Sequence, residues 1–135
     1  MRTEIPDKYV DIMLFARHVN VRCSKLMHSI DDTCSSTLSC NRNQMQILKY
    51  VLVTANFSKE TVVVYGRFSP CIEYQFYAKK SSCAIQFDFG LMQFRLLDEN
   101  KEIVGLYSMK DKTFVALSHF LFPNDEFINF ILKQK

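Results

Sequence analysis

The chain has 135 residues, of which 48% are hydrophobic, and this size and composition predict a single domain, 1–135, around one hydrophobic core. Seventeen basic and fourteen acidic residues leave a formal net charge of +3, which by itself does not indicate a polyanionic partner. The longest apolar run, residues 12–16, is far shorter than the ~18 residues of a membrane-spanning helix, and the first residues have no secretory-leader pattern. We therefore expect a soluble protein of the cytoplasm or nucleus.

The first predicted element is a helix over about 6–19. Pro6 suits a first helical turn, and Asp7 and Asp11 place negative charge near the positive end of the helix dipole. Apolar residues recur on one face at Tyr9, Ile12, Met13, Ala16 and Val19. Apolar residues between 13 and 21 also alternate as in a strand, so both interpretations stay open for this segment.

Residues 22–43 are rich in Ser, Asn, Asp, Thr and Cys, and they predict a long polar connection with one short strand or turn. Its four soft metal ligands are Cys23, His28, Cys34 and Cys40. Zinc modules hold ligands in pairs two to four residues apart, which is not the spacing here. The five cysteines of the chain also contain no Cys-x-x-Cys pair, so we expect reduced thiols and neither metal nor cofactor.

From residue 46 onward, short runs of alternating apolar and polar residues are separated by turn residues, and this pattern predicts antiparallel strands. The expected strands are 46–54, 61–67, 71–77, 83–89, 92–96, 103–109 and 113–118. The period then changes, because Phe127, Phe130 and Ile131 follow helical spacing. With Asn124 as the expected cap, a C-terminal helix is predicted over about 124–134.

These elements predict an α+β fold, in which an antiparallel meander of about seven strands is covered by the C-terminal helix. In element order across roughly 46–134, the chain resembles the pleckstrin-homology type of split barrel, although no motif carries this resemblance; an open sheet is the alternative. The resemblance implies binding of lipids, peptides or proteins alike, since this superfold carries many functions.

Catalytic signatures are missing from the sequence. The three histidines are His18, His28 and His119, and of these His119 follows a predicted strand from which it could meet Cys71 or Cys83 in space. Only three glycines are present, so a phosphate-cradling loop is hard to build. We therefore expect no enzymatic activity.

The leading hypothesis is a non-enzymatic adaptor or complex subunit that binds another protein chain or a second copy of itself. The predicted contact residues lie on or beside the strands, at Val63, Tyr65, Arg67, Phe68, Tyr74 and Tyr77. Self-association is expected through an unprotected strand edge around 61–77.

The alternative hypothesis is binding of single-stranded nucleic acid through a sheet face. Lys79 and Lys80 at a predicted hairpin tip, and Arg95 among aromatic residues, would hold phosphates while the aromatic rings stack on bases.

Overall fold

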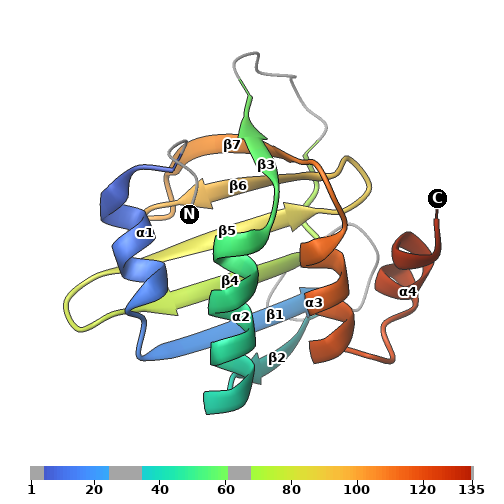
Figure 1. The fold of residues 1–135 in the computed structure, drawn as a ribbon, viewed down its shortest axis with the longest axis horizontal. Helices are drawn as coiled ribbons and strands as arrows, with labels where there is room; N and C mark the ends of the chain where they lie inside the picture. The colour runs from blue at the N-terminus through green and yellow to red at the C-terminus, as the bar shows by residue number, and fades with distance from the viewer. Residues whose placement is uncertain (1–4, 25–34, 61–67, 135) are drawn as a thin grey trace.

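The computed structural model describes residues 5–24, 35–60 and 68–134, which form an α+β fold with a seven-stranded antiparallel sheet (Figure 1). The strands are β1 (His18–Ser24), β2 (Ser35–Ser39), β3 (Phe57–Lys59), β4 (Ile72–Tyr77), β5 (Ser82–Asp88), β6 (Gln93–Leu97) and β7 (Ile103–Met109). The helices are α1 (Asp7–Leu14), α2 (Arg42–Thr54), α3 (Thr113–Leu121) and α4 (Glu126–Lys133). None of the helices in these described ranges is long and apolar enough to cross a membrane.

The spatial order of the strands is β2-β1-β4-β5-β6-β7-β3. Strands β4 to β7 form a meander of four strands, whereas about seven consecutive strands were predicted, and the α+β class with a seven-stranded antiparallel sheet is confirmed. Among the described strands the sheet is open, because β2 and β3 end it without pairing to each other. The predicted edge around 61–77 needs correction: residues 61–67 lie outside the described residues, and β4 is an interior strand between β1 and β5.

The sheet has two different faces because successive side chains of a strand point to opposite sides. One face packs against the helices, and Figure 1 shows α1, α2 and α3 in front of it. Aromatic rings fill this side, where Phe87 lies 4.7 Å from Phe114 of α3 and Phe94 lies 5.0 Å from Tyr107, centroid to centroid. We call the opposite side the polar face, because strands β1, β4, β5 and β6 carry Arg22, Glu73, Gln86 and Arg95 there.

The predicted strand 46–54 is wrong, since these residues belong to helix α2. A capping box starts this helix: the Asn41 side chain accepts from Gln44 N at 2.8 Å, and the Gln44 side chain accepts from Asn41 N at 2.8 Å. Leu48, Val51 and Leu52 are buried at helical spacing. The hydrogen bonds of the capping box and the burial of one helix face thus stabilise the helix more than its β-branched residues favour a strand.

The predicted strand 113–118 is also wrong, since it lies within helix α3. Asp111 Oδ1 accepts a hydrogen bond from Thr113 N at 3.0 Å and so satisfies a donor of the first turn. The helix buries most of its circumference against the sheet, α2 and α4. A helix that is apolar almost all round has no polar stripe, so its period was hidden in the sequence.

The N-terminal prediction is half right. Helix α1 ends at Leu14, and strand β1 begins at His18, so the alternation that kept a strand open belongs to β1. The polar connection predicted for 22–43 contains the end of β1, strand β2 and the start of α2. The short strand expected within this connection is therefore present as β2.

The C-terminal helix is confirmed as α4, although its cap is Asp125 and not Asn124. Asp125 Oδ1 accepts a hydrogen bond from Ile128 N at 2.9 Å. At the other end, Lys112 Nζ donates to the carbonyl of Ile131 at 2.9 Å and also to that of Gln134. A side chain from the start of α3 thus caps the C-terminus of α4.

Candidate functional site

The residues predicted to bind a partner do not form one surface. Val63, Tyr65 and Arg67 lie outside the described residues. Tyr74 is a core residue, and its hydroxyl shares a buried hydrogen bond of 2.7 Å with Ser118 Oγ. Its side chain therefore offers no docking surface.

The remaining two, Phe68 and Tyr77, contact polar-face side chains. The Phe68 ring lies against the guanidinium of Arg95, with 4.4 Å between Arg95 Cζ and the ring centroid. The exposed Tyr77 hydroxyl donates to Gln75 Oε1 at 3.0 Å. Both aromatic residues therefore belong to the surroundings of the polar face.

The basic residues of the nucleic-acid hypothesis are split between two places. Lys79 and Lys80 are exposed in the turn between β4 and β5. Arg95 lies in β6, where it pairs with Gln86, which in turn pairs with Glu73. The structure therefore places Arg95 in a cross-strand row that is distinct from the lysine turn.

The candidate metal ligands are not brought together where the structure describes them. His28 and Cys34 lie outside the described residues. Cys40 donates its backbone N–H to Val19 O, four residues along β1 from Cys23, a separation of ~13 Å along a strand. Cys23 and Cys40 therefore cannot share one ion, and no group of three metal-ligating residues occurs within 5–24, 35–60 and 68–134.

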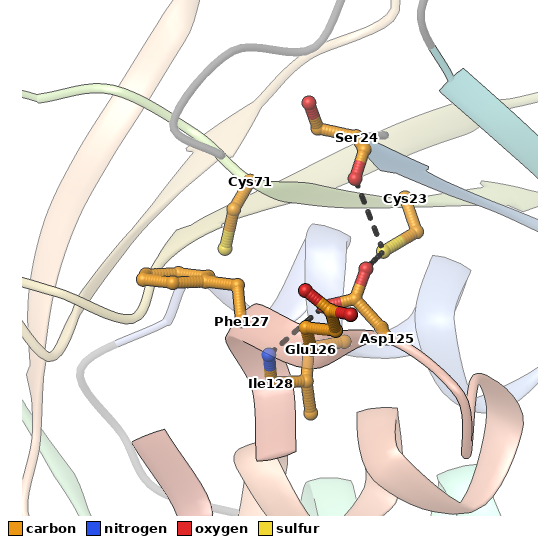
Figure 2. Close-up of a pocket in the computed structure, with 7 residues that line it drawn as sticks. All are labelled: Cys23, Ser24, Cys71, Asp125, Glu126, Phe127 and Ile128. Carbon is orange, nitrogen blue, oxygen red and sulfur yellow. Dashed lines mark hydrogen bonds between the residues drawn. The ribbon is translucent and has the colours of Figure 1, made fainter. Parts of the chain in front are cut away.

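A small pocket of about 80 Å³ lies where the end of β1 meets the start of α4 (Figure 2). Cys23 Sγ donates to Asp125 Oδ2 at 3.2 Å, and the same carboxylate caps α4 through its other oxygen. Cys71 also lines the pocket, and its thiol donates to Phe87 O at 3.5 Å. The Cys23–Asp125 contact thus ties α4 to the sheet.

The thiols of this pocket are poor nucleophiles. Burial, followed by the hydrogen bond and negative charge of Asp125, raises the pKa of Cys23 far above its usual range. Burial likewise raises the pKa of Cys71 to about 12. A nucleophilic cysteine needs a lowered pKa beside a base, whereas the neighbour here is a carboxylate that stabilises the thiol. In the described part of the chain, His119 Nδ1 is buried without a hydrogen-bond partner, and the Cys71 thiol donates to a backbone carbonyl and not to this imidazole.

The polar face carries a charged group that we name the Glu73 cluster, made of Arg22, Glu73, Gln86, Arg95 and Lys101. Glu73 is only 1% exposed although it lies on the face without helices. Its Oε1 accepts from Gln86 Nε2 at 2.6 Å, while its Oε2 lies 3.4 Å from Arg22 Nη2 and 3.5 Å from Lys101 Nζ. Arg95 Nε donates to Gln86 Oε1 at 2.7 Å, which completes the row.

Electrostatics keep Glu73 ionised despite its burial. Burial alone would raise the pKa of this carboxyl, but the amide donors of Gln86 and Gln75 and the charges of Lys101 and Arg22 outweigh it, and the pKa is lowered. One negative charge thus lies beneath three positive ones. The cluster lines a hollow of about 320 Å³, to which Leu97 and Ile103 add apolar contacts.

The helix side of the molecule has a different character. The helix-layer surface, as we name it, consists of the exposed apolar residues Tyr50 and Val53 of α2, Phe120 of α3 and Phe130 of α4. Tyr50 and Val53 are three residues apart and therefore share a face of α2. Helix α3 contacts both α2 and α4, so the three helices lie in sequence across the molecule (Figure 1).

The sequence alone did not predict the Glu73 cluster or most of the helix-layer surface. A signal for the cluster existed, because Glu73, Gln86 and Arg95 occupy polar positions of alternating strands. The strand register that aligns them was not readable from the sequence. The capping box at Asn41 and Gln44 was the signal for α2, and thereby for the exposed position of Tyr50.

Comparisons of the chain with protein-family models, with curated proteins and with solved structures found no match. We therefore infer function from the geometry and chemistry of the described residues.

Proposed function

We propose that this protein is a non-enzymatic module that binds another protein through its helix-layer surface. The observation that carries the proposal is the exposure of three aromatic side chains on neighbouring helices: Tyr50 is 68% exposed, Phe120 49% and Phe130 57%. Aromatic residues are enriched at the centres of protein interfaces, where they bury much area at a low cost in side-chain entropy. Their removal from water would stabilise a complex.

The chemistry of the described residues supports binding over catalysis. Cys71 and Cys83 each have a pKa raised to about 12 by burial, so both remain protonated thiols. Asp125 at the pocket caps a helix, and Glu73 on the polar face is engaged in the Glu73 cluster. Both carboxylates stabilise the fold, and the exposed apolar side chains of the helix-layer surface are available to a protein partner.

A reducing compartment suits this module. Cys23, Cys40, Cys71 and Cys83 are all free thiols, and three of them are buried. Free buried thiols are typical of proteins kept reduced, so we place the function in the cytoplasm or the nucleus. The partner is another protein chain, and light scattering of the purified protein separates this from a second copy of the same chain.

The test compares what tagged variants recover from an extract of the native cell. Tyr50→Glu and Phe120→Glu place a charge on the proposed interface, whereas Asn100→Glu places the same charge on an exposed position of the turn between β6 and β7. We expect the parent and Asn100→Glu to recover the same partner, and the other two variants to recover about tenfold less. Equal recovery by all four proteins, each folded by circular dichroism, would overturn the proposal.

A further inference from the structure

We propose that the Glu73 cluster on the polar face binds phosphate groups of a single-stranded nucleic acid. This function is separate from protein binding, because it uses the opposite side of the sheet. The cluster gathers three cationic side chains from three different parts of the chain: Arg22 of β1, Arg95 of β6 and Lys101 of the turn between β6 and β7. Among the described residues that line the hollow, three are cationic and one, Glu73, is anionic.

The buried carboxylate of Glu73 is shared between two amide donors and two of these cations. Two amide donors satisfy Glu73 first, since Gln86 donates at 2.6 Å and Gln75 donates to the other oxygen. Arg22 and Lys101 also donate to Glu73 Oε2, at 3.4 and 3.5 Å, distances that are long for charge-assisted hydrogen bonds. Glu73 therefore acts as a positioning residue that holds both cations over the hollow.

Arg95 is held in place for a ligand. Its Nε donates to Gln86 Oε1 at 2.7 Å, and the Phe68 ring supports its guanidinium at 4.4 Å. Its two terminal nitrogens have no hydrogen-bond partner among the residues that the structure describes. The guanidinium is thus held through Nε, and its two terminal nitrogens can donate two parallel hydrogen bonds to two oxygens of a phosphate.

The turn between β6 and β7 delivers Lys101 to the same hollow. Asp98 Oδ1 accepts from Asn100 N at 2.8 Å and from Glu102 N at 3.0 Å, which fixes the turn. Lys101 has a φ of 66°, a left-handed conformation that favours glycine or asparagine over lysine. Its side chain is nevertheless 57% exposed and turned towards Glu73. A lysine at this position thus costs conformational energy and adds a cation to the hollow.

The shape of the hollow favours a phosphate that belongs to a chain. Lys101 and Ile103 are more than half exposed at its rim, so a ligand lies across it and is not enclosed. Tyr77 is connected to the cluster through Gln75 and offers an exposed ring for a base to stack on. Stacking on aromatic rings combined with cationic phosphate contacts is the usual mode of single-strand binding.

The test is fluorescence anisotropy of a labelled thymidine oligonucleotide over a series of salt concentrations. Lys101→Asn removes the cation and keeps a residue that tolerates the left-handed backbone, and Lys133→Asn removes an exposed lysine from α4 as the matched control. We expect Lys101→Asn to weaken binding about fivefold and to reduce the slope of log K against log salt by ~0.7, while Lys133→Asn changes neither.

A third variant and a competitor separate this ligand from other anions. Tyr77→Ala should weaken oligonucleotide binding about fivefold or more through lost stacking, while the inhibition constant of inorganic phosphate, obtained by competition with the same oligonucleotide, stays unchanged. An oligoglutamate peptide of equal charge should compete poorly. Equal behaviour of Lys101→Asn and Lys133→Asn, no binding by the parent at low salt, or equal competition by oligoglutamate would each overturn the proposal.

Discussion

Cys71 and Cys83 show how burial couples a single side chain to the stability of the whole protein. Burial raises the pKa of each thiol to about 12, from an ordinary value of 9.0, because the thiolate loses its hydration. In the unfolded chain the thiols ionise first. Their contribution to stability is therefore complete below pH 9.0 and is lost as the pH rises towards 12.

The prediction is a fall in the free energy of unfolding above about pH 9, with a shallower fall for Cys83→Ala. Removing one ionising thiol should reduce the slope by up to about 1.4 kcal/mol per pH unit, which is the linkage of one proton. Urea unfolding at several pH values measures both slopes. Identical slopes for parent and variant would show that Cys83 ionises equally in both states.

The Lys112 side chain stabilises the C-terminal end of α4. Its ammonium donates to the carbonyl groups of Ile131 and Gln134 at the end of α4. Lys112→Met keeps the aliphatic length and removes the donor, so the free energy of unfolding should fall by about 1–2 kcal/mol. Lys110→Met, at an exposed lysine two residues earlier, is the control, and urea unfolding of the two variants is expected to differ by that amount.

At the scale of elements, α4 carries the sharpest contrast between buried and exposed side chains. Phe127 and Ile131 are buried, whereas Phe130 on the same helix is 57% exposed. Phe127→Ala should lower the free energy of unfolding by about 3–5 kcal/mol, and Ile131→Ala by about 2–5 kcal/mol, because each leaves a cavity between α4 and its neighbours.

The matched substitution Phe130→Ala should change the free energy of unfolding by less than about 0.5 kcal/mol, since no cavity forms at an exposed site. Thermal or urea melts followed by circular dichroism measure all three variants. If Phe127→Ala melts like Phe130→Ala, α4 is not part of the core.

The secondary-structure predictions were correct where the local sequence pattern alone determines the element. Strands β4 to β7 alternate cleanly, and α4 has both a cap and a stripe, so these were predictable. Helices α2 and α3 were predicted as strands because Val51, Val53 and Val115 have a high strand propensity. Packing against the sheet stabilises the helical conformation more than this propensity favours a strand. Local preference is a weak guide where tertiary contacts bury several sides of an element.

The candidate sites were harder to predict, because they depend on which strands are neighbours. Arg22 of β1 meets Glu73 of β4 only through the pairing of strands that are 51 residues apart. Lys101 reaches Glu73 from a turn in another part of the sheet. Arg95 was predicted as a binding residue. Its place in the Glu73 cluster depends on the register between neighbouring strands, and the alternation within one strand does not determine that register.

At the scale of the whole molecule, the two sides of the sheet are chemically distinct. The helix side exposes the aromatic residues Tyr50, Phe120 and Phe130, and the polar face carries the Glu73 cluster. A protein partner on the first side would leave the second free. The two proposed functions are therefore separable by substitution, with Tyr50→Glu acting on one and Lys101→Asn on the other.

Hydroxyl-radical footprinting of the complex with the recovered partner tests whether a protein docks on the helix-layer surface. The method reads the solvent exposure of individual aromatic side chains, and Tyr77 on the polar side serves as an internal control. We expect the oxidation of Tyr50, Phe120 and Phe130 to fall severalfold in the complex while that of Tyr77 stays unchanged. Protection of Tyr77 with no change at Tyr50, Phe120 and Phe130 would contradict docking on the helix-layer surface.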